Sequence, residues 1–179
     1  MNLRISTFSA LLFVMVFFTA CPKNEDDSFT LEQGGTLTAT VDGDLFSASG
    51  TEITAEHNTI NTVTHTLTIG GIELPINGVT KSIVLAAVLT NNPTGFVSGE
   101  VYTASDPDRV AAGEYVRNDN SVDIKALSSN TGEATITITE IDFTNNLVSG
   151  TFSFDASDDD DPNTIYKIRN GEFKEVAFD

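Results

Sequence analysis

The chain has 179 residues, of which 26 are acidic and 9 are basic, and its net charge is −17. A field of this sign repels nucleic-acid phosphates, so nucleic-acid binding is excluded as the main function. The single cysteine allows no internal disulfide, and the chain is long enough to bury the core of one domain without one.

The first 20 residues have the layout of a secretory signal peptide. Arg4 precedes an apolar run over residues 10–20, which is too short to span a bilayer as a helix. Cys21 directly follows this run, an order that resembles a bacterial lipoprotein signal, with Phe18 where Leu or Val is usual.

This resemblance implies that the sulfur of Cys21 receives a diacylglyceryl group and that Cys21 becomes the first residue of the mature protein. Two chains suffice for stable attachment, because each buried methylene contributes about 0.8 kcal/mol. We therefore expect residues 1–20 to be removed, Cys21 to be the lipidation site, and the lipid membrane to be a partner through acylated Cys21.

Residues 21–34 are expected to be an acidic, flexible tether. Its cluster of Lys23, Glu25, Asp26 and Asp27 resembles the export signal that follows the acylated cysteine in Bacteroidota lipoproteins. This likeness implies display on the outer face of the outer membrane, and the alternative location is the periplasmic leaflet.

Residues 35–179 predict a single all-β domain. Apolar residues alternate with Thr or Ser in successive segments, which places apolar side chains on a core and hydroxyls in water. Turns are expected at Asp42–Asp44 and Gly70–Gly71. The pattern favours an antiparallel β-sandwich of about eight to ten strands, and a closed calycin-like β-barrel is the alternative. The alternating segments are 36–41, 62–69, 122–126, 134–139 and 148–154.

Residues 134–143 and 147–155 are expected to form one long hairpin. The apolar phase changes between Ile138 and Ile141, which predicts a β-bulge near Glu140. The turn is expected at Asn145–Asn146, because asparagine tolerates left-handed backbone conformations.

The segment 83–89 is apolar at every position, so a strand there presents apolar groups to both faces of a sheet. Three interpretations are open. It is a central strand whose outer face is covered by a loop or the tether, a surface for a partner or apolar ligand, or a short helix.

The two histidines are the candidates for any serine–histidine–acid triad. His57 lies in a polar segment and is expected to be an exposed turn residue, whereas His65 lies on an apolar face and is expected to be a hydrogen-bonded core or rim histidine. The sequence has no Gly-x-Ser-x-Gly motif, and its cysteine is assigned to lipid rather than zinc. We predict no enzyme, no catalytic residue and no cofactor, except for the calcium considered next.

An acidic run near residue 158 is expected to lie in a loop between two strands. Calcium binds six to eight oxygen ligands, which such a loop offers, although the run lacks the spacing and glycine of an EF-hand. The favoured interpretation is a solvated loop that discourages aggregation. A second acidic loop, 106–108, contributes only if the fold brings it near. The candidate calcium ligands are Asp155, Asp158, Asp159, Asp160 and Asp161.

Three segments, Thr36–Gly43, Ser149–Phe154 and Asn170–Phe173, follow the signal in this order. Together they resemble an uncharacterised domain family of small Bacteroidota outer-membrane lipoproteins. The resemblance covers most of the mature chain and implies its location and an all-β fold, and it carries no activity.

These observations favour a non-enzymatic binding or structural module of the cell envelope, with a glycan or an envelope protein as partner. The alternative is a lipocalin-like carrier, whose small apolar ligand would lie in a barrel lined by Phe152, Phe154 and Leu85. The candidates for an aromatic sugar-binding surface are Tyr102, Tyr115 and Tyr166.

Overall fold

A computed structural model of the protein describes residues 34–119 and 122–179, so the predicted signal peptide, Cys21 and nearly all of the tether lie outside the described residues. The described part consists of eleven β-strands and two 3₁₀ turns. It contains no helix long and apolar enough to cross a membrane. The strands are β1 (Thr36–Val41), β2 (Asp44–Ser49), β3 (Ile53–Asn61), β4 (Thr64–Ile76), β5 (Val79–Leu89), β6 (Val101–Thr103), β7 (Arg109–Asn118), β8 (Asp123–Leu127), β9 (Ala134–Asp142), β10 (Leu147–Asp158) and β11 (Ile165–Ala177).

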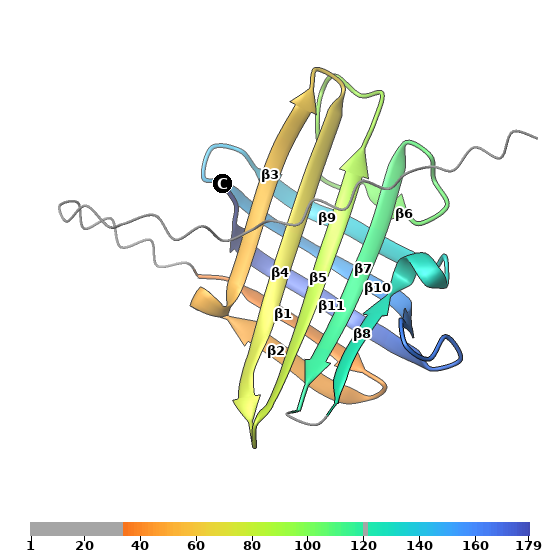
Figure 1. Cartoon of the computed structure of the whole chain (residues 1–179). Helices are drawn as coiled ribbons and strands as arrows, with labels where there is room; N and C mark the ends of the chain where they lie inside the picture. Colours follow the sequence, from red (N-terminus) through yellow and green to blue (C-terminus); the bar gives the residue numbers. More distant parts are fainter. Residues whose placement is uncertain (1–33, 120–121) are drawn as a thin grey trace, which may run out of the picture. The chain divides into compact units, whose positions relative to one another are not determined.

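The strands form one sheet that folds over into two layers. Their order is β2-β1-β11-β10-β9-β6-β7-β5-β4-β3, and neighbours are antiparallel except for the parallel pair β6 and β7. Strands β3, β4, β5, β7 and β8 make the front layer in Figure 1, and β1, β2, β9, β10 and β11 lie behind them. Within the described residues no ladder joins β2 to β3, so the sheet is a sandwich and not a closed barrel. The predicted antiparallel β-sandwich is confirmed.

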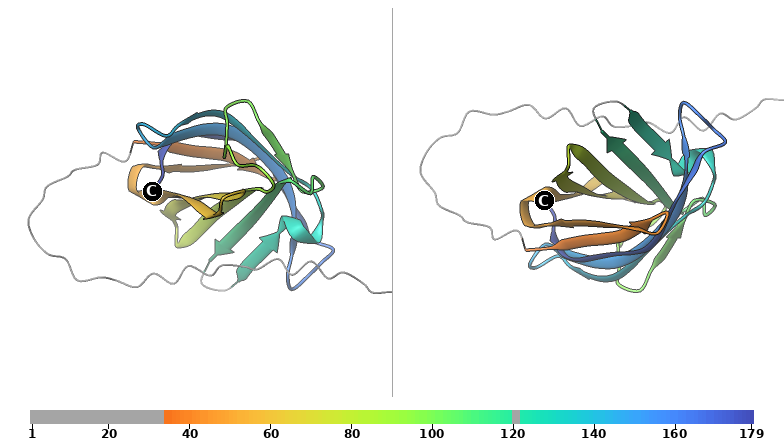
Figure 2. Two further views of the ribbon diagram at one scale, coloured as in Figure 1. Left: turned by 90° about the horizontal axis from the view of Figure 1, so that it is seen from above. Right: turned by 90° about the horizontal axis from the view of Figure 1, so that it is seen from below.

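Two short strands join the layers along one side, where the layers converge in Figure 2. Strand β8 pairs with β7 and β10, so that Leu127 lies opposite both Glu114 and Ser157. Strand β6 pairs with β9 and β7. These joining strands bring the total to eleven, above the expected number.

The core lies between the layers and is filled with side chains. Phe152, Phe154 and Leu85, which were proposed to line a ligand cavity, are 4%, 2% and 1% exposed. Gly171 leaves room for the ring of Phe152, because a Cβ on this glycine would come within 2.6 Å of the ring. The aromatic rings thus fill the space between the layers to close packing.

The long hairpin is confirmed. In β9 and β10, Ile138 lies opposite Gly150 and Glu140 opposite Ser149, so Thr139 is the extra residue of a bulge next to Glu140. Asn146 has φ 55°, as expected for the turn, but β9 ends at Asp142 and the loop therefore covers residues 143–146.

Some sequence expectations are wrong. Gly70–Gly71 is not a turn, because β4 continues to Ile76. A Cβ on Gly71 would lie 3.2 Å from the Cβ of Ala48, so this glycine allows close approach of the layers. The alternating pattern also places Val63 and Val122 on the core face of strands. In the structure Val63 lies in the turn between β3 and β4, and Val122 precedes β8 and is 52% exposed.

Candidate functional site

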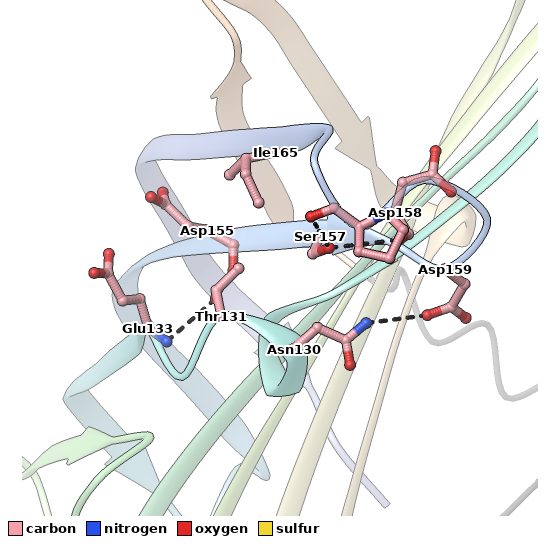
Figure 3. Close-up of a pocket in the computed structure, with 9 residues that line it drawn as sticks. Asn130, Thr131, Glu133, Asp155, Ser157, Asp158, Asp159 and Ile165 are labelled. Carbon is pink, nitrogen blue, oxygen red and sulfur yellow. Dashed lines mark hydrogen bonds between the residues drawn. The ribbon is translucent and has the colours of Figure 1, made fainter.

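An open acidic pocket of about 760 Å³ lies where β10 ends and β9 begins (Figure 3). It contains three of the five predicted calcium ligands, Asp155, Asp158 and Asp159. Sequence reasoning missed Glu133, although the predicted hairpin places it near Asp155, whose backbone N donates to the Glu133 carbonyl over 3.1 Å. The lining residues are Asn130, Thr131, Glu133, Asp155, Ser157, Asp158, Asp159, Pro162 and Ile165.

The three aspartate carboxylates of this pocket bind protein groups and do not converge on one point. Asp155 forms an ion pair with Arg169, and Asp158 Oδ1 accepts from the backbone N of Asp160 over 2.9 Å. Asp159 Oδ1 accepts from Asn130 Nδ2 over 3.1 Å. In Figure 3 the carboxylate of Asp155 lies at one side of the pocket and those of Asp158 and Asp159 at the other. The expected loop is shorter than predicted, because β10 includes Asp155 and Asp158.

Asp160 and Asp161 are exposed residues of the loop and do not line the pocket. Asp161 Oδ2 accepts from Thr164 Oγ1 over 2.7 Å, and this bond, with one from the backbone N of Asn163, lowers the pKa of Asp161.

The aspartates of the second acidic loop, 106–108, accept hydrogen bonds from groups next to the loop. Asp106 Oδ1 accepts from the backbone N of Asp108 and of Arg109, over 2.9 and 3.0 Å, and these bonds lower its pKa. Asp108 Oδ1 accepts from Asn91 Nδ2 over 2.8 Å. Neither aspartate lines the acidic pocket. Among the described residues no group of three or more His, Cys, Asp or Glu is placed to hold a metal ion, and calcium binding stays a prediction.

His65 lies in β4, is 7% exposed and has hydrogen bonds at both ring nitrogens. Nε2 lies 3.1 Å from the Asn92 carbonyl oxygen, which only accepts, so Nε2 carries the proton. Nδ1 then accepts from Thr59 Oγ1 over 3.1 Å. The prediction of a hydrogen-bonded core or rim histidine is confirmed, and neither partner is a carboxylate.

His57 is not an exposed turn residue. It lies in β3, because this strand continues through the polar segment to Asn61. Its ring is stacked on the ring of His65, with the ring centroids 6.1 Å apart. The rings of Phe96, Phe143 and Phe178 surround it, and its buried Nε2 has no hydrogen-bond partner in the described part of the chain. Burial lowers the pKa of His57, and the neighbouring His65 adds to this effect.

The tyrosines do not form an aromatic platform. Tyr102 is fully buried, and its hydroxyl donates to Glu100 Oε2 over 2.6 Å. Tyr115 is 3% exposed, and burial raises its pKa to about 12. The expected surface role is wrong for these two, because their strands direct them into the core. Tyr166 is half-buried and lies against Tyr115, with ring centroids 5.3 Å apart.

A second open depression, of about 500 Å³, lies on the outer face of β9, β10 and β11. Thr135, Thr137, Thr151 and Ser153 line it together with residues 169–172 of β11. Its lining is therefore rich in hydroxyl groups.

The segment 83–89 lies in β5, a central strand that pairs with β4 and β7, so the helix interpretation is wrong. Alternate residues Ile83, Leu85, Ala87 and Leu89 are buried in the core. The residues between them face outward and are half-buried. In Figures 1 and 2 no described element lies over the outer face of this layer.

Most outward residues beside β5 on its neighbours are also small or apolar, apart from Thr66 and Thr68 of β4 and Glu114 of β7. On β7, Ala112 lies opposite Ala86 and Val110 opposite Val88; on β4, Gly70 lies opposite Val84. Sequence reasoning missed β7, because small residues at successive positions give no contrast between its faces. We call this surface the neutral face; it consists of Gly70, Val84, Ala86, Val88, Val110, Ala112, Glu114 and Val116, with Lys125 and Leu127 of β8 at its border.

Two charged side chains belong to the neutral face. Glu114 is half-buried, and this burial raises the pKa of its carboxyl, an effect that Lys125 opposes. Lys125 is opposite Val116 and Glu114 is opposite Leu127, so the two charges are diagonal neighbours on one face. Within the neutral face these two charges balance, and the negative charge of Asp159, whose backbone N donates to the Lys125 carbonyl over 2.9 Å, also acts on Glu114.

Comparison with known proteins identifies the family to which this chain belongs. Neither the curated proteins nor the solved structures include a match to this chain. A family model, described as a domain of unknown function (DUF6252), matches residues 33–177. This match covers nearly all of the described sandwich, and the chain therefore belongs to the DUF6252 family.

Proposed function

We propose that this chain is a membrane-anchored, non-enzymatic module of the cell envelope that binds a protein through its neutral face. The observation that carries the proposal is the neutral face on β4, β5 and β7, whose residues are small or apolar except for Glu114, on a chain with a net charge of −17. Contiguous apolar patches on a soluble domain are typical of interaction sites, and interface centres are depleted in charged residues.

The filled core supports binding at the surface over the lipocalin-like carrier. Phe152, Phe154 and Leu85 are buried, and the ring of Phe152 occupies the space that Gly171 leaves. A carrier of this type needs a cavity of several hundred cubic ångströms inside the sheet. The two pockets described above open instead at the surface.

A protein partner also fits better than a glycan. Sugar-binding surfaces offer aromatic rings for stacking, and two of the three tyrosines, Tyr102 and Tyr115, are buried. The hydrogen bonds of His65 to Thr59 and Asn92 support the non-enzymatic proposal, because a triad requires a carboxylate behind the histidine.

The anchor rests on the order of residues 1–21, where a signal-like segment precedes the single cysteine. Its test compares the full chain with Cys21→Ser in a bacterial host grown with labelled palmitate. We expect the unchanged chain to carry label and to stay with membranes in high salt, and Cys21→Ser to lose both properties. Protease digestion of intact cells then separates surface display from the periplasmic leaflet.

The binding face is tested by thiol labelling in isolated membranes. Ala86→Cys places a thiol at the centre of the neutral face, and Thr151→Cys places the matched control on the exposed outer face of β10. We expect a bulky maleimide to label Thr151→Cys fully and Ala86→Cys poorly, with both labelled equally after dilution in detergent. Equal labelling in membranes would show an uncovered face and refute the proposal.

A further inference from the structure

We propose that protonation of His57 releases residues 178–179 from the edge of β3, so that acid uncovers this edge before the domain unfolds. We call residues 178–179 the edge strap. This inference concerns a conformational switch and goes beyond the proposed function, because it does not involve the neutral face.

The edge strap follows β11 and is held by three backbone hydrogen bonds. Phe178 N donates to the Asn146 carbonyl over 2.9 Å, and Asp179 N donates to the Ala55 carbonyl over 3.4 Å. The Asp179 carbonyl accepts from His57 N over 3.0 Å. Strand β3 is the last in the sheet order, and the strap lies along its outer edge (Figure 1). A short segment with so few bonds is of the kind that opens locally at low free energy.

The side chain of the strap covers His57. The ring of Phe178 is 4% exposed, and its centroid lies 5.9 Å from that of His57 and 5.7 Å from that of Phe143. Phe96 contacts His57 from the loop before β6 and is itself a core residue, 2% exposed. Phe143 is already 49% exposed. Phe178 is therefore the covering ring that can leave without opening the core.

A charged His57 does not fit the closed arrangement. Its Nε2 is buried and has no hydrogen-bond partner in the described part of the chain. In the imidazolium form both ring nitrogens are donors, and a buried donor without an acceptor costs free energy. Protonation therefore favours the arrangement in which Phe178 has left and the ring reaches water.

The elements around His57 do not supply a counter-charge. His65 of β4 is stacked on it, and burial and then His65 lower the pKa of His57. The carboxylates of Glu56 in β3 and Asp142 in β9 accept hydrogen bonds within their own segments. Asp179 contacts β3 through its backbone. Among the described residues, none of these carboxylates offsets the effect of burial on His57.

The size of the response follows from proton linkage. In the released state the ring is in water, where its ordinary pKa is 6.5, and in the closed state burial holds the pKa lower. The proton therefore binds the released state more tightly. The ratio of released to closed molecules should increase by up to about tenfold per pH unit below 6.5, until the closed state itself is protonated.

The test is hydrogen exchange, measured by NMR on the labelled full chain in detergent micelles. The backbone amides of His57, Phe178 and Asp179 donate the three bonds of the strap and are the reporters. Their protection, corrected for the intrinsic exchange rate, should decrease between pH 7 and 5 by up to about tenfold per unit. The amide of Gly113, which donates to the buried Ser128 hydroxyl over 2.8 Å, is the control and should stay far better protected at every pH.

Substitution of His57 ties the response to its ring. His57→Phe keeps an aromatic ring in the cluster and cannot be protonated, so the same three amides should show equal protection at pH 7 and 5. His57→Gln is the second variant, should the larger ring not be accommodated. Phe178→Ala removes the cover, and the amides of residues 57 and 179 should then lose protection at pH 7 as well.

The contrary outcomes are distinct from failure of the proposed function. Protection of the strap that is independent of pH in the unchanged chain would overturn the inference, and so would a pH dependence that persists in His57→Phe and His57→Gln. Equal protection of the strap amides and Gly113 would mean that the strap leaves only on unfolding, which also overturns it. The neutral face is tested separately by labelling of Ala86→Cys in membranes.

Discussion

The ring of Phe154, in β10, lies directly over Gly113, in β7 of the opposite layer. A Cβ on Gly113 would come within 2.5 Å of Phe154 Cδ1, a distance that real Cβ contacts do not show. The backbone N of Gly113 also donates to the buried hydroxyl of Ser128 over 2.8 Å, which fixes β7 at this point. The side chain of one layer and the missing side chain of the other therefore set the spacing between them.

Gly113→Ala should destabilise the domain, because neither the ring of Phe154 nor the fixed backbone of β7 can move aside freely. Overpacking of a core typically costs about 1–3 kcal/mol, and urea unfolding of the variant measures this cost. Gly70→Ala, where the nearest atom is the Thr54 hydroxyl at 3.3 Å, is the matched control and should cost less. Adding Phe154→Leu to Gly113→Ala should recover part of the loss, and simple additivity of the two changes would contradict the contact.

Asn170 should resist replacement by a β-branched residue. It has φ 51°, and it is the extra residue of β11 opposite both β1 and β10, since Phe152 pairs with Gly171 and Phe154 with Ile168. Asn170→Val should cost about 1–2 kcal/mol, because left-handed backbone is unfavourable for side chains branched at Cβ. Asn170→Gly should be nearly neutral in the same thermal unfolding measurement. An equal loss from both variants would locate the effect in the side chain of Asn170.

The stability of the domain should decrease as the pH is lowered, because His57 titrates differently in the folded and unfolded chain. Burial holds the pKa of His57 below its ordinary value of 6.5, so the unfolded chain binds a proton before the folded chain does. This contribution is fully present above pH 6.5 and is lost as pH falls toward and through the folded pKa. Urea midpoints between pH 5 and 8 should decline less at the acidic end in His57→Leu than in the unchanged protein. Parallel curves would exclude His57 as the source.

Calcium should not stabilise the domain. The carboxylate of Asp155 already forms an ion pair, and those of Asp158 and Asp159 already accept hydrogen bonds from protein groups. The carboxylate of Asp155 also lies at the opposite side of the pocket from the other two. Thermal unfolding in millimolar calcium and in chelator should therefore give the same midpoint. An increase with calcium that Asp158→Asn abolishes would restore the acidic pocket as a metal site.

Strands with one solvent-exposed face and one buried face could be predicted most reliably from the sequence. The hairpin of β9 and β10, with its bulge at Thr139, could be predicted because Thr alternates with Ile or Phe. Strand β7 could not, since Ala111, Ala112 and Gly113 offer no such contrast. The Gly70–Gly71 pair misled for a related reason: glycine allows both tight turns and close packing of layers, and the local sequence does not distinguish these uses.

The features of the candidate sites could likewise be predicted from the sequence only in part. The two-sided character of β5 was visible in the sequence, and so was the cluster that contains Asp158. The ion pair of Asp155 with Arg169 and the neighbourhood of Glu114 and Lys125 depend on which strands pair. Such pairings join residues far apart in the chain, and periodicity within a single segment contains no information about them.

The position of β11 has a consequence for how the chain becomes folded. The last strand of the chain lies between β1 and β10, with Leu37 opposite Phe173 and Phe152 opposite Gly171. A polypeptide that emerges amino end first therefore holds β1 without this second paired strand until β11 has been made. The back layer cannot close before β11 has been made, and a product that ends before β11 lacks the buried side chains of Ile168 and Phe173.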